Sequence, residues 1–367
     1  MILKLSITQM LFNAVFQFSN LFINAYLFKE HHDVQLVALY NFYMFLFWGI
    51  TFYIGFKCCE KNTRIGQAMS GVSCIGGTIL LMCGIQNVLW LGMFMGAAGG
   101  FFWTSYLSVY RSLGKNSESG GTFAKVSLMA TLVTVFIPLL FGHIVEGSSY
   151  FIGFLVLLGL GISMFVMSKF VPAHQTQPIR LQKSSFKHPQ FITTCVLQGF
   201  YFSFVNISAG LLVYMAGKGE ASMGSFATYY GMVTVGVTFL IAYILPSKLQ
   251  LKALSFSTLI YLAASLLFII DWSGSVIAFN FALAFAGPLF LNTLIGMHFL
   301  YSNHHYQNGE EGLLVRELAL TLGKLLFFGY MAIFGLEINT LSFMVLLFIG
   351  SLFPFAISIL LKTKSFH

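Results

Sequence analysis

Long runs of apolar residues, separated by short polar stretches, repeat along the whole chain. Most runs are close to the ~20 residues that an α-helix needs to cross a bilayer. They are continuously apolar rather than alternating, which favours helices over a membrane β-barrel. The pattern therefore predicts an all-α membrane protein with twelve transmembrane helices. The expected spans are residues 5–28, 34–56, 65–86, 88–110, 123–145, 148–170, 190–216, 222–245, 252–270, 274–300, 313–336 and 338–361.

One long polar stretch divides the apolar runs into two sets of six. It reads FVPAHQTQPIRLQKSSFKHPQ and contains three prolines. We therefore expect an N-terminal six-helix half (1–170), a cytoplasmic linker (171–189) and a C-terminal six-helix half (190–367). The first apolar run exceeds the roughly 7–15 residues of a signal-peptide core and lacks a small-residue cleavage site, so we expect it to be retained as a span.

The composition excludes a water-soluble globular protein. Of the 367 residues, 57% are hydrophobic and only 8% are charged. A soluble domain carries about 25% charged residues to keep its surface hydrated. The exterior of this protein must therefore face lipid.

The basic residues are segregated between the two sides of the predicted bundle. All of the 19 Lys and Arg residues fall on one side except Lys29 and Lys218. Loops rich in Lys and Arg stay in the cytoplasm, so both termini and the linker are predicted to be cytoplasmic. This distribution accounts for the formal net charge of +8 without nucleic-acid binding, and we expect none.

Weak internal similarity relates the two halves of the chain. NFYMFLFWGITFYIGF (41–56) aligns with TYYGMVTVGVTFLIAY (228–243) at an offset of 187 residues, and two other pairs of spans match at 186 and 188. Six spans return the chain to its starting side, so the repeats have the same orientation. This predicts halves related by a pseudo-two-fold axis along the membrane normal, a parallel repeat known in secondary transporters.

Three short motifs lie at places where a known transporter family carries its own. GFKCCEKNTR (55–64) follows the second span and is similar to a G-x-x-x-D-R-x-G-R-R loop, with one extra residue before the acid. IPLLFG (137–142) is similar to a G-P-x-x-G-G bend in the fifth span. EEGLLVRELALTLGK (310–324) resembles a stretch of a little-characterised putative-transporter branch from Gram-positive bacteria. With twelve spans and a basic linker, the whole chain resembles the major facilitator superfamily.

This resemblance implies a multi-pass protein of the bacterial cytoplasmic membrane. Such a protein would move a small-molecule substrate by rocking its two halves around a midplane site, and the degenerate bend in the fifth span slightly favours export. The same resemblance implies gating roles for charged residues and bend residues at the motifs. For Arg316, Glu317 and Lys324, which open the eleventh span, the alternative is simple snorkelling to the interface. The candidate gating residues are Glu60, Lys61, Arg64, Pro138, Gly142, Arg316, Glu317 and Lys324.

Four amide side chains recur along the first span. Asn13, Gln17, Asn20 and Asn24 follow the spacing i, i+4, i+7 and i+11, which places them on one helical face. Amides are costly in hydrocarbon, so this face should point into the bundle. It could form a cavity wall, or it could make interhelical hydrogen bonds. The resemblance implies that the first, fourth, seventh and tenth spans line the cavity. The further candidate substrate-binding residues on these spans are Trp103, Tyr106, Gln198, Asn206 and Asn292.

The candidate cavity contains amides and aromatic rings, and we expect no fixed charge in it. No Asp or Glu is predicted in the middle of a span. The sequence therefore favours an amphipathic or weakly polar organic substrate, and it leaves the coupling ion open. Zinc-type and ATP-binding motifs are not found, so we expect neither a metal nor a cofactor.

The two alternatives to a transporter are a membrane-embedded enzyme and a non-transporting membrane protein. A membrane-embedded enzyme would need a reactive constellation at one depth, and the sequence offers none. A non-transporting membrane sensor or assembly partner with a transporter-like fold stays open, because no ion relay is apparent. We expect a monomer whose partners are its substrate and the lipid bilayer.

Overall fold

The computed structural model describes most of the chain as a bundle of helices. The described residues are 2–111, 128, 130–132, 134–176, 178, 181, 183–207, 210–211, 213–214, 219–243, 250–269, 275–306, 309–335, 349, 352–357 and 359–360. In this part of the chain every regular element is helical, as the apolar runs predict.

The helices follow the predicted spans closely. In the first part of the chain they are α1 (Ile2–Gln17), the π-helix η1 (Phe18–Ile23), α2 (Asn24–His31), α3 (Val34–Cys59), α4 (Thr63–Met82), α5 (Val88–Arg111), α7 (Ile137–Gly147) and α8 (Tyr150–Met167). In the second part they are the short 3-10 helix η3 (Lys183–Phe186), α9 (Pro189–Ile207), α11 (Glu220–Tyr243), α12 (Gln250–Ile269), α13 (Ser275–His305) and α14 (Gly309–Phe334).

Local side chains fix the ends of several helices. The Asp33 carboxylate accepts a hydrogen bond from the Gln35 backbone N–H and caps α3, and the Asn62 side chain caps α4 through the Arg64 N–H. His32 ends α2 in the left-handed conformation with a φ of 51°. These caps make the α2–α3 and α3–α4 turns tight. The two turns mark opposite ends of α3, and we call these ends of the bundle the α2–α3 end and the α3–α4 end.

Within the described residues, nine helices are long and apolar enough to cross a membrane. Their outward faces are apolar: Leu140, Leu259 and Ile333 are each at least 59% exposed, which suits contact with lipid. The nine correspond to the predicted spans one to six, eight, ten and eleven. The predicted seventh span, 190–216, contains most of α9, and the ninth contains the shorter apolar helix Lys252–Ala264. Most of the predicted twelfth span lies outside the described residues, so the number twelve stays a prediction.

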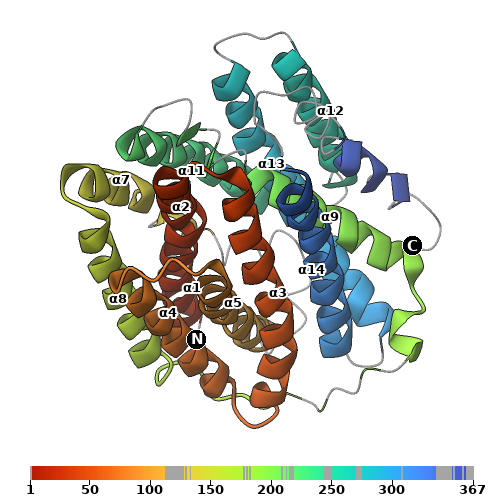
Figure 1. Ribbon diagram of the computed structural model, residues 1–367. Coiled ribbons are helices and arrows are strands. Elements are labelled where there is room, and N and C mark those ends of the chain that lie inside the picture. Colours follow the sequence, from red (N-terminus) through yellow and green to blue (C-terminus); the bar gives the residue numbers. More distant parts are fainter. Residues whose placement is uncertain are drawn as a thin grey trace.

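The first and second parts of the chain meet along two helix pairs. Figure 1 shows α3 beside α14 in the centre of the molecule, and the Phe45 and Phe328 rings stack there with centroids 5.5 Å apart. The second pair is α7 and α11. A Cβ atom at Gly142 would lie 2.6 Å from the Glu220 carbonyl oxygen, and one at Gly224 would overlap the Pro138 carbonyl oxygen. Pro138 and Gly142, two of the candidate gating residues, therefore lie where the two parts touch.

A ridge of small residues brings α5 against α3. Gly92, Gly96 and Gly100 each face the α3 backbone, and a Cβ atom at Gly96 would overlap the Met44 carbonyl oxygen. This close approach is typical of membrane helices packed through small residues.

We expect Gly96→Val to destabilise the protein because the added side chain cannot fit against α3. Overpacking of this kind costs about 1–3 kcal/mol. The matched control is Gly159→Val, at an exposed position of α8 that has no neighbouring atom within 4 Å of the added Cβ. Thermal unfolding in detergent should show a lower melting temperature for Gly96→Val than for Gly159→Val. Equal melting temperatures would contradict the packing described for α3 and α5.

Candidate functional site

In the part of the chain that the structure describes, helices of the bundle line two cavities. Cavity 1 has a volume of about 150 Å³ and is lined by Phe16, Trp48, Trp103, Leu107, Gln198, Phe202, Leu291, Ile295, Phe299, Arg316, Glu317, Leu320 and Lys324. Cavity 2 has a volume of about 210 Å³ and is lined by Phe16, Gln17, Asn20, Leu21, Thr131, Val135, Pro138, Val205, Asn206, Phe226, Ala227, Tyr230, Gly231, Thr234 and Asn280. Phe16 lines both, so its side chain lies between them.

Each cavity is built from both parts of the chain. Cavity 1 takes side chains from α1, α3 and α5 on one side and from α9, α13 and α14 on the other. Along the first span and along α9, the residues that line cavity 1 come first and those that line cavity 2 come later. The first span leads toward the α2–α3 turn. Cavity 2 therefore lies nearer the α2–α3 end, and cavity 1 lies nearer the α3–α4 end.

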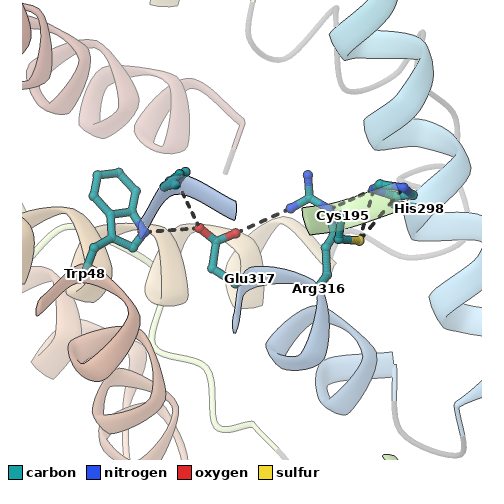
Figure 2. A network of polar contacts seen from close by, with 6 residues as sticks. Trp48, Cys195, His298, Arg316 and Glu317 are labelled. Atoms are coloured by element: carbon teal, nitrogen blue, oxygen red, sulfur yellow. Dashed lines mark hydrogen bonds and ion pairs between the residues drawn. The ribbon is translucent and has the colours of Figure 1, made fainter. Parts of the chain in front are cut away.

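Cavity 1 contains a buried group of three charged residues on α14. Arg316, Glu317 and Lys324 are each no more than 6% exposed. Glu317 Oε2 lies 3.5 Å from Arg316 Nη1, and Glu317 Oε1 lies 3.9 Å from Lys324 Nζ. Trp48 Nε1 donates a hydrogen bond of 3.1 Å to Glu317 Oε1 (Figure 2). One carboxylate thus faces two basic side chains, and the group has a formal net charge of +1.

Aromatic rings surround the Lys324 ammonium. Its Nζ atom lies 4.6 Å from the centre of the Phe45 ring, 4.9 Å from Trp48 and 5.2 Å from Phe202. A cation within about 6 Å of an aromatic face is attracted by the ring quadrupole. Phe45 and Trp48 belong to α3, whereas Phe202 belongs to α9, so this charge contacts both parts of the chain.

Polar side chains behind Arg316, those of His298, Thr194 and Cys195, orient its guanidinium group. Its Nε–H donates to His298 Nδ1 at 3.3 Å, as Figure 2 shows. An accepting Nδ1 means that the neutral ring carries its proton on Nε2, which lies 3.3 Å from Thr194 Oγ1. Cys195 Sγ lies 3.8 Å from the same ring. The imidazole is therefore a neutral acceptor that holds the guanidinium toward the cavity.

Amide side chains gather at cavity 2. Gln17 and Asn20 come from the first span and Asn206 from α9. Within the described part of the chain, Gln17 Oε1, Asn20 Oδ1 and Asn206 Nδ2 are buried and have no hydrogen-bond partner. Buried amides normally bond to protein or water, so three unpartnered amide groups at one cavity mark it as a polar site.

The other predicted substrate-binding residues lie elsewhere. Asn41 Nδ2 donates to Asn24 Oδ1 at 2.9 Å, and Tyr106 OH donates to Gln9 Oε1 at 2.8 Å, so both Asn24 and Tyr106 join helices together. Asn13 and Asn292 are half-buried and line neither cavity. Of the nine predicted residues, the structure brings Trp103 and Gln198 to cavity 1 and Gln17, Asn20 and Asn206 to cavity 2.

The candidate gating residues of the α3–α4 turn contact their own part of the chain. Glu60 Oε1 accepts from Lys57 Nζ at 2.6 Å, one turn away on α3. Arg64 Nε donates to the Val171 carbonyl at 2.8 Å, which ties the turn to the segment after α8. Lys61 is exposed. Their gating role stays a prediction.

A charged cluster at the α2–α3 end was not foreseen from the sequence. Lys29 Nζ donates to Glu220 Oε1 at 2.8 Å, and Tyr150 OH donates to the same oxygen at 3.0 Å. Glu146 Oε2 accepts from the Ala221 backbone N–H at 2.6 Å. Lys29, Glu146 and Tyr150 belong to the first part of the chain, so these contacts join it to the start of α11. We call this set the Glu220 cluster.

Comparison with known sequences gives relatives of unknown function. No family model matches the sequence. The chain is 21% identical over 333 residues to the uncharacterised protein YqgE of Bacillus subtilis, a match that covers 84% of this chain and 76% of that protein. A 93-residue segment is 33% identical to an uncharacterised protein from the sodM 3′ region of Geobacillus stearothermophilus, covering 24% of this chain and 44% of that one.

Comparison with solved structures decides the fold. The human organic anion transporter MFSD10 (TETRAN) superposes with a TM-score of 0.75 at 12% identity, covering 98% of both chains. A bacterial homologue of the iron transporter ferroportin, in an outward-facing state, gives 0.67 at 13% identity over 98% of both chains. This chain has a major facilitator fold. The fold implied by the sequence motifs is thus confirmed.

Proposed function

We propose that this protein with a major facilitator fold is a secondary transporter that moves a small organic solute by alternating access. The observation that carries the proposal is cavity 1, which is lined by side chains from both parts of the chain. Rocking one half against the other around such a cavity would open it to each side of the membrane in turn. The aromatic lining suits an organic solute, which sites of this kind bind mainly through apolar contacts.

The proposal includes the architecture and orientation expected from the sequence. Twelve spans would form two six-helix halves in a bacterial cytoplasmic membrane, with both termini in the cytoplasm, and the chain would act as a monomer. Cavity 1 would then lie nearer the cytoplasm and cavity 2 nearer the outside. Export is favoured slightly by the resemblance of the fifth-span bend to that of exporters.

The cargoes of the structural neighbours differ from each other. One is an organic anion transporter and the other a homologue of an iron transporter, so they support transport without agreeing on a substrate. The alternative is a non-transporting membrane sensor or assembly partner with the same fold, and such a protein should keep a single arrangement of the two halves.

Breaking the Glu220 cluster is expected to open the α2–α3 end. In the double variant Lys29→Gln/Glu220→Gln, the ion pair that joins the halves there is lost, whereas both side chains keep their approximate length. Lys29 is half exposed, so the pair contributes about 1 kcal/mol, equal to roughly a fivefold change in the ratio of the two states. Spin labels at the exposed positions His32 and Ser222, measured by electron–electron double resonance, should report a larger long-distance population.

A second pair of spin labels distinguishes alternating access from a general loosening of the helix bundle. Lys61 and His304 are exposed near the α3–α4 end, and labels there should move closer together when those at the α2–α3 end move apart. All labels are placed on a variant whose five native cysteines are replaced. A single unchanged distance at both ends in every variant would contradict alternating access and favour the sensor.

A further inference from the structure

We propose that cavity 1 binds a monovalent organic anion with a flat apolar body about the size of one aromatic ring. The inference rests on the proposed transport function, because it names the substrate class of the same cavity. Its starting point is the charge group of α14, which the sequence alone suggested would lie at the mouth of a span.

The cavity has an uncompensated positive charge. Its three charged lining residues are Arg316, Glu317 and Lys324, two cations and one carboxylate. A buried charge without a counter-charge is costly, because the surroundings polarise far less than water does. A ligand carboxylate would supply the missing negative charge, whereas an organic cation would meet repulsion from the same group.

The polar atoms around the cavity leave room for that carboxylate. Lys324 Nζ lies 3.9 Å from Glu317 Oε1, which is beyond hydrogen-bond distance, so the ammonium can turn its donors to a ligand. Arg316 uses Nε for His298 and directs one terminal nitrogen toward Glu317. The guanidinium has five N–H donors in total, and its remaining donors can serve a carboxylate.

Gln198 gives an independent sign of a polar ligand. Its side chain is only 4% exposed and lines cavity 1, yet its Oε1 atom has no hydrogen-bond partner among the described residues. The oxygen and nitrogen of a glutamine amide are interchangeable by a half-turn of the side chain. The amide can therefore present its NH₂ group to a carboxylate in the cavity.

The shape and lining of the cavity select the rest of the ligand. Phe16, Trp48, Trp103 and Phe202 provide aromatic walls. The volume of about 150 Å³ is of the size at which an engineered apolar cavity holds benzene. Aromatic rings stack well on one another, so a carboxylate attached to a single ring fits both the charge and the walls.

Three probes of nearly equal size test the proposal on the purified wild-type protein. Benzoate is the anion, benzamide the neutral analogue and benzylamine the cation, and binding is followed by calorimetry and by the fluorescence of Trp48 and Trp103, both in the cavity wall. Benzoate should bind at least about tenfold more tightly than benzamide, because charge-assisted hydrogen bonds are the stronger ones. Equal binding of benzamide, tighter binding of benzylamine, or displacement of benzoate by equimolar chloride would overturn the proposal.

Variants assign the effect to the charge in the cavity. Lys324→Gln should weaken benzoate binding about tenfold or more and leave benzamide binding within about twofold. Lys252→Gln, at an exposed position of α12, is the matched control and should change neither. If Lys324→Gln does not fold, the comparison of the three probes on the wild-type protein still tests whether cavity 1 prefers an anion.

The binding experiment tests the anion site and the spin-label experiment tests transport, so either proposal can fail without the other. Selective benzoate binding with fixed spin-label distances would leave the anion site standing and refute transport. Alternating distances without a preference for benzoate would leave transport standing and refute the anion site.

Discussion

Replacing Glu317 by glutamine is expected to lower the free energy of unfolding by about 3–5 kcal/mol, because it leaves two buried cations without a counter-charge. The Glu317 carboxylate is 3.5 Å from Arg316, 3.9 Å from Lys324 and hydrogen-bonded to Trp48. The variant keeps the size of the side chain and the Trp48 acceptor, so packing should change little. Unfolding of the detergent-solubilised protein, by heat and by denaturant, measures the loss.

A carboxylate near the surface, with 23% of its side chain exposed, serves as the control for this variant. Glu60→Gln removes the ion pair with Lys57 on the surface of α3, and such pairs contribute less than about 1 kcal/mol. The double variant Glu317→Gln/Lys324→Met should recover part of the lost stability, because one of the orphaned cations is removed with little change in length. Equal stabilities of Glu317→Gln and Glu60→Gln would show that the three charges do not form a coupled buried group.

The helices were predictable because their signal is local. An apolar run bounded by polar turns specifies a membrane helix without reference to the rest of the chain. The expected spans 34–56 and 88–110 match α3 and α5 to within a few residues. The motif resemblance likewise led to the fold that the solved structures confirm.

The amide face of the first span was only partly predictable. The α-helical spacing places Asn13, Gln17, Asn20 and Asn24 on one face, but the π-helix η1 runs from Phe18 to Ile23. A π-helical turn contains an extra residue, so side chains after it rotate away from the α-helical pattern. Gln17 and Asn20 consequently line cavity 2, whereas Asn24 bonds to Asn41 on α3.

The charged cavity could not be located because its contacts are far apart in the sequence. Arg316, Glu317 and Lys324 were expected at the mouth of the eleventh span, and the cavity was expected to hold no fixed charge. In the structure α14 begins at Gly309, so these residues lie two to four turns inside the helix. Trp48 and Glu317 are 269 residues apart, and Lys29 and Glu220 are 191 apart. Charge within an apolar run is the one sequence signal that would have suggested a site.

A disulfide between Val135 and Gly231 is expected to stop alternating access. Cysteine at both positions would place the Cβ atoms 3.7 Å apart, close to the ~3.8 Å typical of disulfides. Both residues line cavity 2, and they belong to different parts of the chain. The bond should prevent these walls from separating, and it should lower access to cavity 1 from the α2–α3 end about a hundredfold or more.

A disulfide within one part of the chain is the matched control. Cysteines at Gly66 and Ser105 would have Cβ atoms 3.5 Å apart, and they would join α4 to α5. This bond should leave access unchanged, because the two helices move together. Both pairs are built on the variant that lacks the native cysteines, and reduction should reverse any effect.

Alternating access is tested most directly by labelling Gln198→Cys in cavity 1 with a membrane-impermeant thiol reagent. The labelling rate is measured from each face of oriented vesicles. With the Val135–Gly231 pair reduced, labelling should proceed from both faces. With the pair oxidised, it should continue from the α3–α4 face and stop from the α2–α3 face. Labelling from one face alone in both states, or from both faces regardless of the disulfide, would contradict a cavity that opens alternately between two moving halves.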